Sequence, residues 1–165
     1  MSSYSYGKAE VRRWVLDNFP AEAEILDVGA CDGIWRFLLP RYENMDAVEI
    51  FGPSAERLIG YRRVFHTDIA EFPYLWYDLI IFGDVIEHMT VERAKAVLDY
   101  ASTRCRDMIV AVPYLYEQDE IYGNPWEKHL QPDLTPEIFA QRYPQLTVLH
   151  DTGMDYCYYH KRGAP

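Results

Sequence analysis

The sequence has few cysteines, no long apolar run and a deficit of positive charge. Its three cysteines, Cys31, Cys105 and Cys157, are far apart and form no C-x-x-C pair. An odd number without metal-ligand spacing argues against a disulfide framework, so we expect a reducing, cytoplasmic location. No stretch is long enough to span a bilayer, and residues 1–19 lack the apolar core of a signal peptide. We therefore expect no membrane association.

The deficit of basic residues narrows the class of partner. The 165 residues include 16 Lys and Arg against 26 Asp and Glu, for a formal net charge of −10. Proteins that bind long nucleic acids use Lys and Arg to neutralise phosphates. The charge balance therefore argues against a long DNA or RNA partner and favours a small molecule.

Short apolar segments alternate with amphipathic ones along the chain. Strands are predicted at residues 24–29, 45–50, 63–66, 77–82, 107–112, 146–150 and 154–160. Helices are predicted at residues 1–20, 33–39 and 53–60, from Thr90 to residue 101, and from Thr135 onward, where each threonine can be the N-cap.

This order of elements predicts the fold class. Alternating strands and helices indicate one α/β domain over residues 1–165, with a doubly wound, mostly parallel, seven-stranded sheet and helices on both faces. Only a short turn at residues 151–153 separates the last two strands. The last strand is therefore expected to be antiparallel.

The first predicted strand ends in a glycine-containing turn, Asp27-Val-Gly29-Ala-Cys31-Asp-Gly33. In open α/β sheets, ligands bind beyond the carboxyl ends of the strands, where glycines let the backbone approach them closely. A nicotinamide dinucleotide fingerprint requires G-x-G-x-x-G. Here Gly29 and Gly33 are four residues apart, with Cys31 between them. This spacing disfavours a nicotinamide-dependent oxidoreductase.

The turn resembles the first motif of class I S-adenosylmethionine-dependent methyltransferases, an acidic residue followed by G-x-G-x-G, with Cys31 replacing the middle glycine. The later strand ends and the antiparallel last strand also agree with that family. The resemblance implies that Glu49 accepts hydrogen bonds from the cofactor ribose, that Asp68 faces the adenine amino group and that Ile69 contacts the ring. The implied cofactor-binding residues are Asp27, Gly29, Ala30, Cys31, Gly33, Glu49, Ile50, Asp68, Ile69, Gly83 and Asp84.

Acidic and imidazole side chains follow the fourth predicted strand, in the segment Asp84-Val-Ile-Glu87-His88. One helical turn separates the two carboxylates, and His129 lies in a later loop that could close over them. Together, these four side chains could hold Mg²⁺ or Mn²⁺ and lower the pKa of an attacking hydroxyl. The segment resembles the E-x-x-E-H arrangement of small-RNA 2′-O-methyltransferases and of some ubiquinone-pathway O-methyltransferases, with Asp84 in the first position.

We predict catalytic roles for His129, His88 and Glu87, because methyl transfer to a hydroxyl often requires removal of its proton. The alternatives stay open at this point. His88 could pack against the cofactor, His129 could be a surface histidine, and an E-H pair also occurs in family members that use no metal.

A long polar and aromatic loop is predicted over residues 113–134. Loops of this length in compact domains tend to be functional. The loop contains four aromatic residues that are predicted to form a lid or stacking surface for the substrate, namely Tyr114, Tyr116, Tyr122 and Trp126. Trp35 is predicted to lie in the same wall of the site.

Together, these patterns predict O-methylation of a small molecule such as a sugar, a sugar nucleotide or a phenolic compound, with S-adenosylmethionine as methyl donor. Cys31 in the glycine turn keeps a second hypothesis open, a cofactor-binding regulatory or pseudo-enzyme subunit without turnover. Because the short chain lacks the extra helices that many relatives use to cover the substrate, a homodimer that completes the pocket is a further hypothesis.

Overall fold

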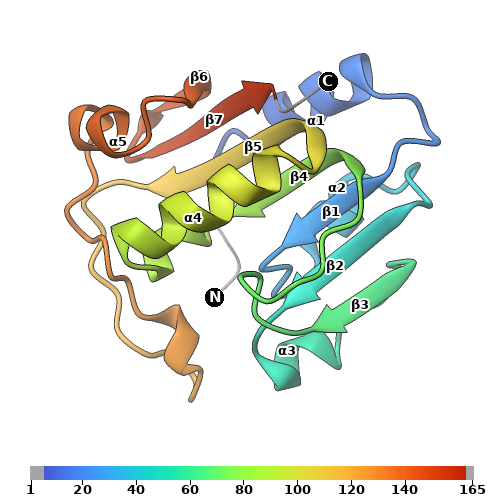
Figure 1. The fold of residues 1–165 in the computed structure, drawn as a ribbon, viewed down its shortest axis with the longest axis horizontal. Coiled ribbons are helices and arrows are strands. Elements are labelled where there is room, and N and C mark those ends of the chain that lie inside the picture. Colours follow the sequence, from blue (N-terminus) through green and yellow to red (C-terminus); the bar gives the residue numbers. More distant parts are fainter. Residues whose placement is uncertain (1–5, 163–165) are drawn as a thin grey trace.

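Seven strands form one sheet in the order β3-β2-β1-β4-β5-β7-β6 (Figure 1). The computed structural model describes residues 6–162. The strands are β1 Ile25–Val28, β2 Met45–Glu49, β3 Arg63–His66, β4 Tyr77–Gly83, β5 Cys105–Pro113, β6 Thr147–Met154 and β7 Tyr156–Arg162. The pairs from β3 to β5 are parallel, whereas β7 is antiparallel to both of its neighbours. The predicted fold class is therefore confirmed, with β7 as the antiparallel strand.

Within residues 6–162, five α-helices and two short 3₁₀-helices accompany the sheet. They are α1 Lys8–Asn18, α2 Ile34–Leu38, α3 Gly52–Ala55, η1 Ile86–His88, α4 Val91–Ser102, η2 Pro125–Glu127 and α5 Pro136–Arg142. The two predicted threonine caps are confirmed, since the side chains of Thr90 and Thr135 accept hydrogen bonds from the backbone N–H groups of Arg93 and Ile138. Residues 1–5 of the first predicted helix lie outside the described residues.

The two faces of the sheet are covered by different helices, as predicted. Alternate strand residues such as Val110 and Val112 join the core under α4 and α5, whereas Ile109 and Ala111 join the core under α1 and α2. Figure 1 shows α4 lying across one face of the sheet. Because both faces are covered, the central strands β1, β2 and β4 are almost entirely buried.

Two predicted boundaries were wrong. The third helix ends at Ala55 rather than at residue 60, because the N–H groups of Arg57 and Leu58 bond in i→i−3 turns and, among the described residues, no helical bond continues the helix beyond them. Gly60 then has a φ of 81°, outside the helical region. The predicted turn at residues 151–153 is a bulge inside β6, where the pairing skips from Asp151 to Met154. The chain reverses at Asp155 instead, between Met154 and Tyr156.

Candidate functional site

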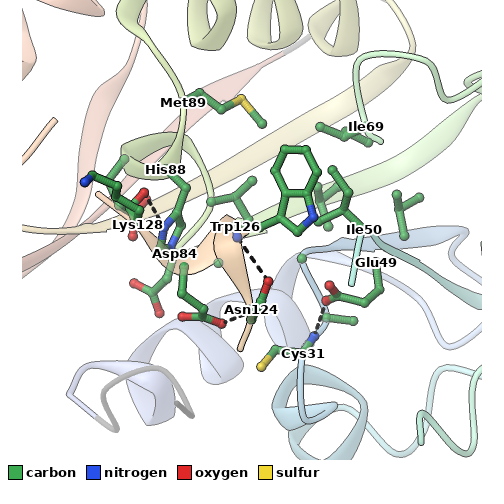
Figure 2. A pocket seen from close by; sticks show the side chains of 18 of the residues that line it. Cys31, Glu49, Ile50, Ile69, Asp84, His88, Met89, Asn124, Trp126 and Lys128 are labelled. Carbon is green, nitrogen blue, oxygen red and sulfur yellow. Dashed lines mark hydrogen bonds between the residues drawn. The ribbon is translucent and has the colours of Figure 1, made fainter. Parts of the chain in front are cut away.

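A cavity of about 370 Å³ lies beyond the carboxyl ends of β1, β2 and β4 (Figure 2). It is at the switch point of the sheet, where β1 has β2 on one side and β4 on the other. Residues from the glycine turn, the strand ends and the loop after β5 line one continuous space. Of the predicted site residues, the cavity is lined by Asp27, Gly29, Ala30, Cys31, Glu49, Ile50, Asp68, Ile69, Gly83, Asp84, Glu87, His88, Tyr116, Trp126 and His129.

The glycine turn packs tightly against Val85, which follows β4. Gly29 has a φ of 66°, and a Cβ atom there would lie 2.5 Å from Cγ2 of Val85. Cys31 also has a left-handed φ, 47°, which a residue with a side chain adopts only at some cost in energy. Gly33 is the N-cap of α2 and does not line the cavity.

Glu49 fixes this turn from the end of β2. One of its carboxylate oxygens accepts a hydrogen bond from the N–H of Cys31 and the other from the N–H of Phe51, both at 2.8 Å. Burial raises the pKa of Glu49, and the backbone hydrogen bonds oppose that rise. Each carboxylate oxygen can accept a second hydrogen bond. Glu49 can therefore hold the turn and bind a diol at the same time.

Asp27 lies buried beneath the turn. It accepts a hydrogen bond from the hydroxyl of Tyr61. Burial raises the pKa of Asp27 to about 7, although that hydrogen bond and the nearby charge of Lys8 both oppose the rise. Sequence reasoning missed both Tyr61 and Lys8. For Lys8 a signal was available, since it shares one helical face with the buried Val11 and Val15.

The acid after β3 has a partner that sequence reasoning also missed. Arg93 of α4 forms an ion pair with Asp68, whose other carboxylate oxygen accepts a hydrogen bond from the N–H of Ala70 at 2.9 Å. Burial favours a higher pKa for Asp68, but the bonds to Arg93 and Ala70 outweigh it and lower the pKa. Asp68 is therefore held ionised at the edge of the cavity.

Asp84 was predicted to be a metal ligand, but its carboxylate bonds to a tyrosine of β7 instead. It has a left-handed φ of 57°, and its carboxylate accepts a hydrogen bond from the hydroxyl of Tyr156 at 2.6 Å. Tyr156 is 72 positions away in the sequence, so no local pattern could have indicated this bond. Among the described residues, the group suited to holding a metal ion consists of Glu87, His88 and His129, without Asp84.

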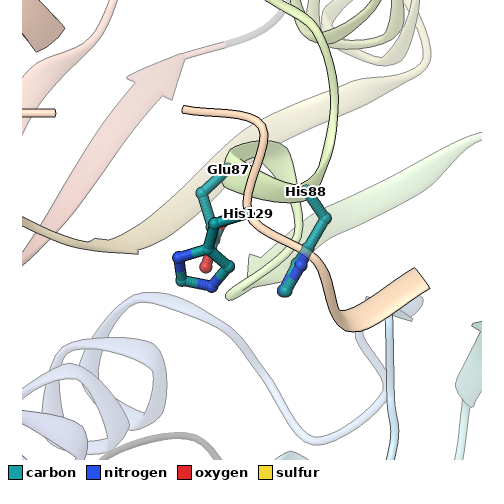
Figure 3. Close-up of side chains that lie close together, drawn as sticks. All are labelled: Glu87, His88 and His129. Atoms are coloured by element: carbon teal, nitrogen blue, oxygen red, sulfur yellow. The ribbon is translucent and has the colours of Figure 1, made fainter. Parts of the chain in front are cut away.

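Glu87, His88 and His129 come together at one end of the cavity (Figure 3). Each offers one ligand atom, and these atoms all lie within 4.8 Å of one another. The Nδ1 atoms of His88 and His129 face the backbone carbonyls of Lys128 and Tyr116, at 3.3 and 2.7 Å. Because a carbonyl only accepts, each Nδ1 must carry the proton, which leaves both Nε2 atoms as acceptors.

The electrostatics of this cluster differ from those of exposed residues. Glu87 is 1% exposed, and within residues 6–162 neither of its carboxylate oxygens has a hydrogen-bond partner. Burial, followed by the charge of Asp84, raises the pKa of Glu87 well above its usual value. Burial and the neighbouring imidazole lower the pKa of His88 to about 4, and burial also lowers that of His129. Both imidazoles are therefore neutral at pH 7.

The long loop after β5, residues 114–134, brings only part of its aromatic set to the cavity. Tyr116 and Trp126 line it, as does the predicted wall residue Trp35. Tyr122 was expected there but is 92% exposed. Tyr114 was also expected there but lies in the core, because strand alternation places it on the same face as Val110 and Val112, with its hydroxyl bonded to that of Tyr159.

Trp126 lies in an unexpected part of the cavity. Figure 2 shows its indole beside Ile50 and Ile69, in the half that also contains Glu49. Asn124 fixes the backbone there by accepting a hydrogen bond from the N–H of Trp126 at 3.1 Å. Trp126 therefore faces the side predicted to receive the cofactor, whereas His129, three residues later, faces the opposite end.

None of the helices within residues 6–162 combines the length and the apolar character needed to cross a membrane.

Comparison with known proteins identifies the fold. No family model matches the sequence, and no curated protein matches it either. Among solved structures, an S-adenosylmethionine-dependent methyltransferase from Clostridium acetobutylicum is 14% identical, with 96% of this chain and 91% of that chain covered and a TM-score of 0.70.

Two other solved structures contain ligands. The 1,6-didemethyltoxoflavin-N1-methyltransferase of Burkholderia thailandensis, with bound 1,6-didemethyltoxoflavin and S-adenosylhomocysteine, is 16% identical over 95% of this chain and 76% of that chain, with a TM-score of 0.67. The N-terminal domain of EvdMO1, in the presence of S-adenosylhomocysteine and D-fucose, is 17% identical over 99% of this chain and 85% of that chain, with a TM-score of 0.66. The chain therefore has the class I methyltransferase fold.

Proposed function

We propose that the protein is an S-adenosylmethionine-dependent methyltransferase that methylates an oxygen of a small molecule. The observation that carries the proposal is that a single cavity joins two chemically different ends. One end contains Glu49, Ile50 and Ile69, and the other contains Glu87, His88 and His129. A transfer reaction requires this arrangement, because donor and acceptor must meet within one space.

The residues at the first end fit an adenosine-containing cofactor. The free acceptor positions of Glu49 suit the two hydroxyls of a ribose. Ile50 and Ile69 offer apolar contact for a purine, with the ionised Asp68 at the edge for its amino group. S-adenosylmethionine, when bound, supplies an electrophilic methyl group on a sulfonium.

The residues at the second end suit ligation better than proton removal by an imidazole alone. A general base works best when its pKa lies near the working pH, and that of His88 is about 4. Neutral imidazoles whose Nε2 atoms are free, together with a carboxyl that has no hydrogen-bond partner within residues 6–162, are instead suited to a divalent cation. We propose that Glu87, His88 and His129 hold Mg²⁺ or Mn²⁺, which would lower the pKa of a bound hydroxyl.

The remaining work of the protein is to position the acceptor and exclude water. Tyr116 and the backbone of the long loop cover the acceptor end. The size of the cavity and the small ligands of two solved neighbours support a compact acceptor such as a sugar, a sugar nucleotide or a phenolic compound. We also propose a cytoplasmic location and a homodimer that completes the pocket. Light scattering of the purified protein tests whether it is a dimer.

Calorimetric titration with S-adenosylhomocysteine tests the cofactor half of the proposal. We expect micromolar binding that is lost in Glu49→Ala and kept in Glu43→Ala, a matched control at an exposed glutamate. Absence of binding to folded wild-type protein would refute the proposal. A second experiment tests the metal site. We expect Mn²⁺ binding, followed by electron paramagnetic resonance, to be lost in His129→Ala and kept in His150→Ala. Equal binding by both variants would exclude the proposed ligands.

A cofactor-binding protein without turnover is the second candidate. The left-handed Cys31, at the position where the family has glycine, favours it. Tight S-adenosylhomocysteine binding without methyl transfer to any acceptor from a panel of sugars and phenols would support this reading.

A further inference from the structure

Lys8, the first residue of α1, is a buried cation without a hydrogen-bond partner among residues 6–162. Its side chain is 3% exposed. A buried ammonium is unfavourable unless it is paired and hydrogen-bonded. Its Nζ atom lies 5.1 Å from the ring centre of Trp35, a residue that lines the cavity.

A second buried donor lies beside it. Trp35 is 2% exposed, and its Nε1 atom also has no hydrogen-bond partner among the described residues. That atom faces Gly83, where a Cβ would come within 2.8 Å of it. Gly83 also lines the cavity. Two neighbouring donors therefore lack acceptors among the described residues, whereas buried donors in native proteins are generally satisfied.

The charges around Lys8 indicate what kind of group would satisfy these donors. The carboxylates of Asp84, Asp27 and Asp32 are near enough to act on Lys8 electrostatically. A simple anion would be repelled by these three acids. An α-amino acid group is a better match, because its carboxylate can accept from Lys8 and Trp35 while its ammonium faces the acids. The side chains of S-adenosylmethionine and S-adenosylhomocysteine end in such a group.

Resting on the proposed function, we propose that Lys8 and the indole N–H of Trp35 bind the α-carboxylate of the cofactor. The first helix is then part of the cofactor site. These two residues distinguish S-adenosylmethionine from adenosine derivatives that have no amino acid end. Neither acts on the methyl group, so both are binding residues.

The test compares two ligands that differ at this end only. S-adenosylhomocysteine has the amino acid group, and 5′-methylthioadenosine lacks it while keeping the adenosine and the sulfur. In calorimetric titrations at pH 7.5, we expect Lys8→Met to weaken S-adenosylhomocysteine binding at least tenfold and to change 5′-methylthioadenosine binding by less than twofold. Lys8→Arg should recover part of the loss. Lys95→Met, at an exposed lysine of α4, should behave as wild type for both ligands.

The opposite outcomes are equally clear. If Lys8 only neutralises the three acids, its removal will leave S-adenosylhomocysteine binding unchanged or tighten it, because the ammonium of the ligand will meet more negative charge. Either result, or equal weakening of both ligands, would overturn the inference. If Lys8→Met does not fold, Trp35→Phe, which removes only the indole donor, should show the same selective loss. Wild-type protein that binds neither ligand would instead refute the proposed function.

Discussion

Asp27 is a buried carboxyl whose ionisation should be visible in the stability of the ligand-free protein. Its pKa is about 7 in the folded protein, because burial disfavours the charged form. In the unfolded chain it returns to about 3.9. A group with a raised folded pKa stabilises the protein below its unfolded pKa, and that contribution is lost as the pH rises toward the folded pKa. Stability should therefore fall between about pH 4 and pH 7.

The size of the effect follows from the shift. Each pH unit between the two pKa values changes the free energy of unfolding by about 1.4 kcal/mol. Between pH 5 and pH 7 the loss is therefore about 2–3 kcal/mol. Asp27→Asn removes the titration and keeps an oxygen that can accept from Tyr61. Between pH 5 and pH 7, the free energy of unfolding of the variant should therefore rise by about 2–3 kcal/mol relative to that of wild type.

Urea unfolding at pH 5, 6, 7 and 8 measures this difference, since both proteins share every other titrating group. The exposed Asp17→Asn, on α1, is the matched control and should follow wild type at each pH. Parallel pH profiles for wild type and Asp27→Asn would refute the reasoning. They would mean that Lys8 and Tyr61 keep Asp27 ionised throughout.

Three further predictions concern the walls of the cavity. Glu49→Ala, which removes the acceptor for the N–H groups of Cys31 and Phe51, should lower the free energy of unfolding by roughly 2–3 kcal/mol in urea titrations; an unchanged midpoint would contradict this. Cys31→Gly should raise the free energy of unfolding by about 1 kcal/mol, because glycine adopts the left-handed backbone without strain, whereas Cys31→Ala should not raise it. Equal thermal midpoints for the two variants would show that no strain is stored at this position. Tryptophan emission should change when S-adenosylhomocysteine binds, and Trp126→Phe should reduce that change, with Trp35 giving the remainder; a full response in the variant would place the reporter elsewhere.

Much of the fold was predictable because each core element carries its own periodic pattern. The apolar stripe of α4 and its threonine cap fixed that helix, and the buried runs of β1 and β4 fixed those strands. The wrong boundaries lie where the main chain can form different hydrogen-bonded turns of similar energy. Nothing in the composition of residues 151–155 distinguishes a tight turn from a bulge followed by a turn.

The gathering of the site was predictable for a topological reason. Parallel strands bring their carboxyl ends to one edge, so Glu49 and the segment at Glu87 had to approach the glycine turn. Contacts between distant side chains were not predictable. The bond between Asp84 and Tyr156, for example, depends on the position of β7 in the sheet. Tyr114 was misplaced because its strand extends one residue further than expected, and alternation then turned the ring into the core.

Backbone hydrogen bonds help to fasten the long loop at both of its ends. The N–H groups of Tyr114 and Leu115 bond to the carbonyls of Asp155 and Leu134, and those of Leu130 and Gln131 bond to the carbonyl of Glu87. Main-chain bonds of this kind form whatever side chain the residue carries, proline excepted. Residues 119–123 take part in none of these anchoring bonds, so they can diverge without loosening the anchors on either side. Under the proposed function, substitutions in this segment can therefore change what approaches the acceptor end, while Asn124 and Trp126 keep their places in the cavity.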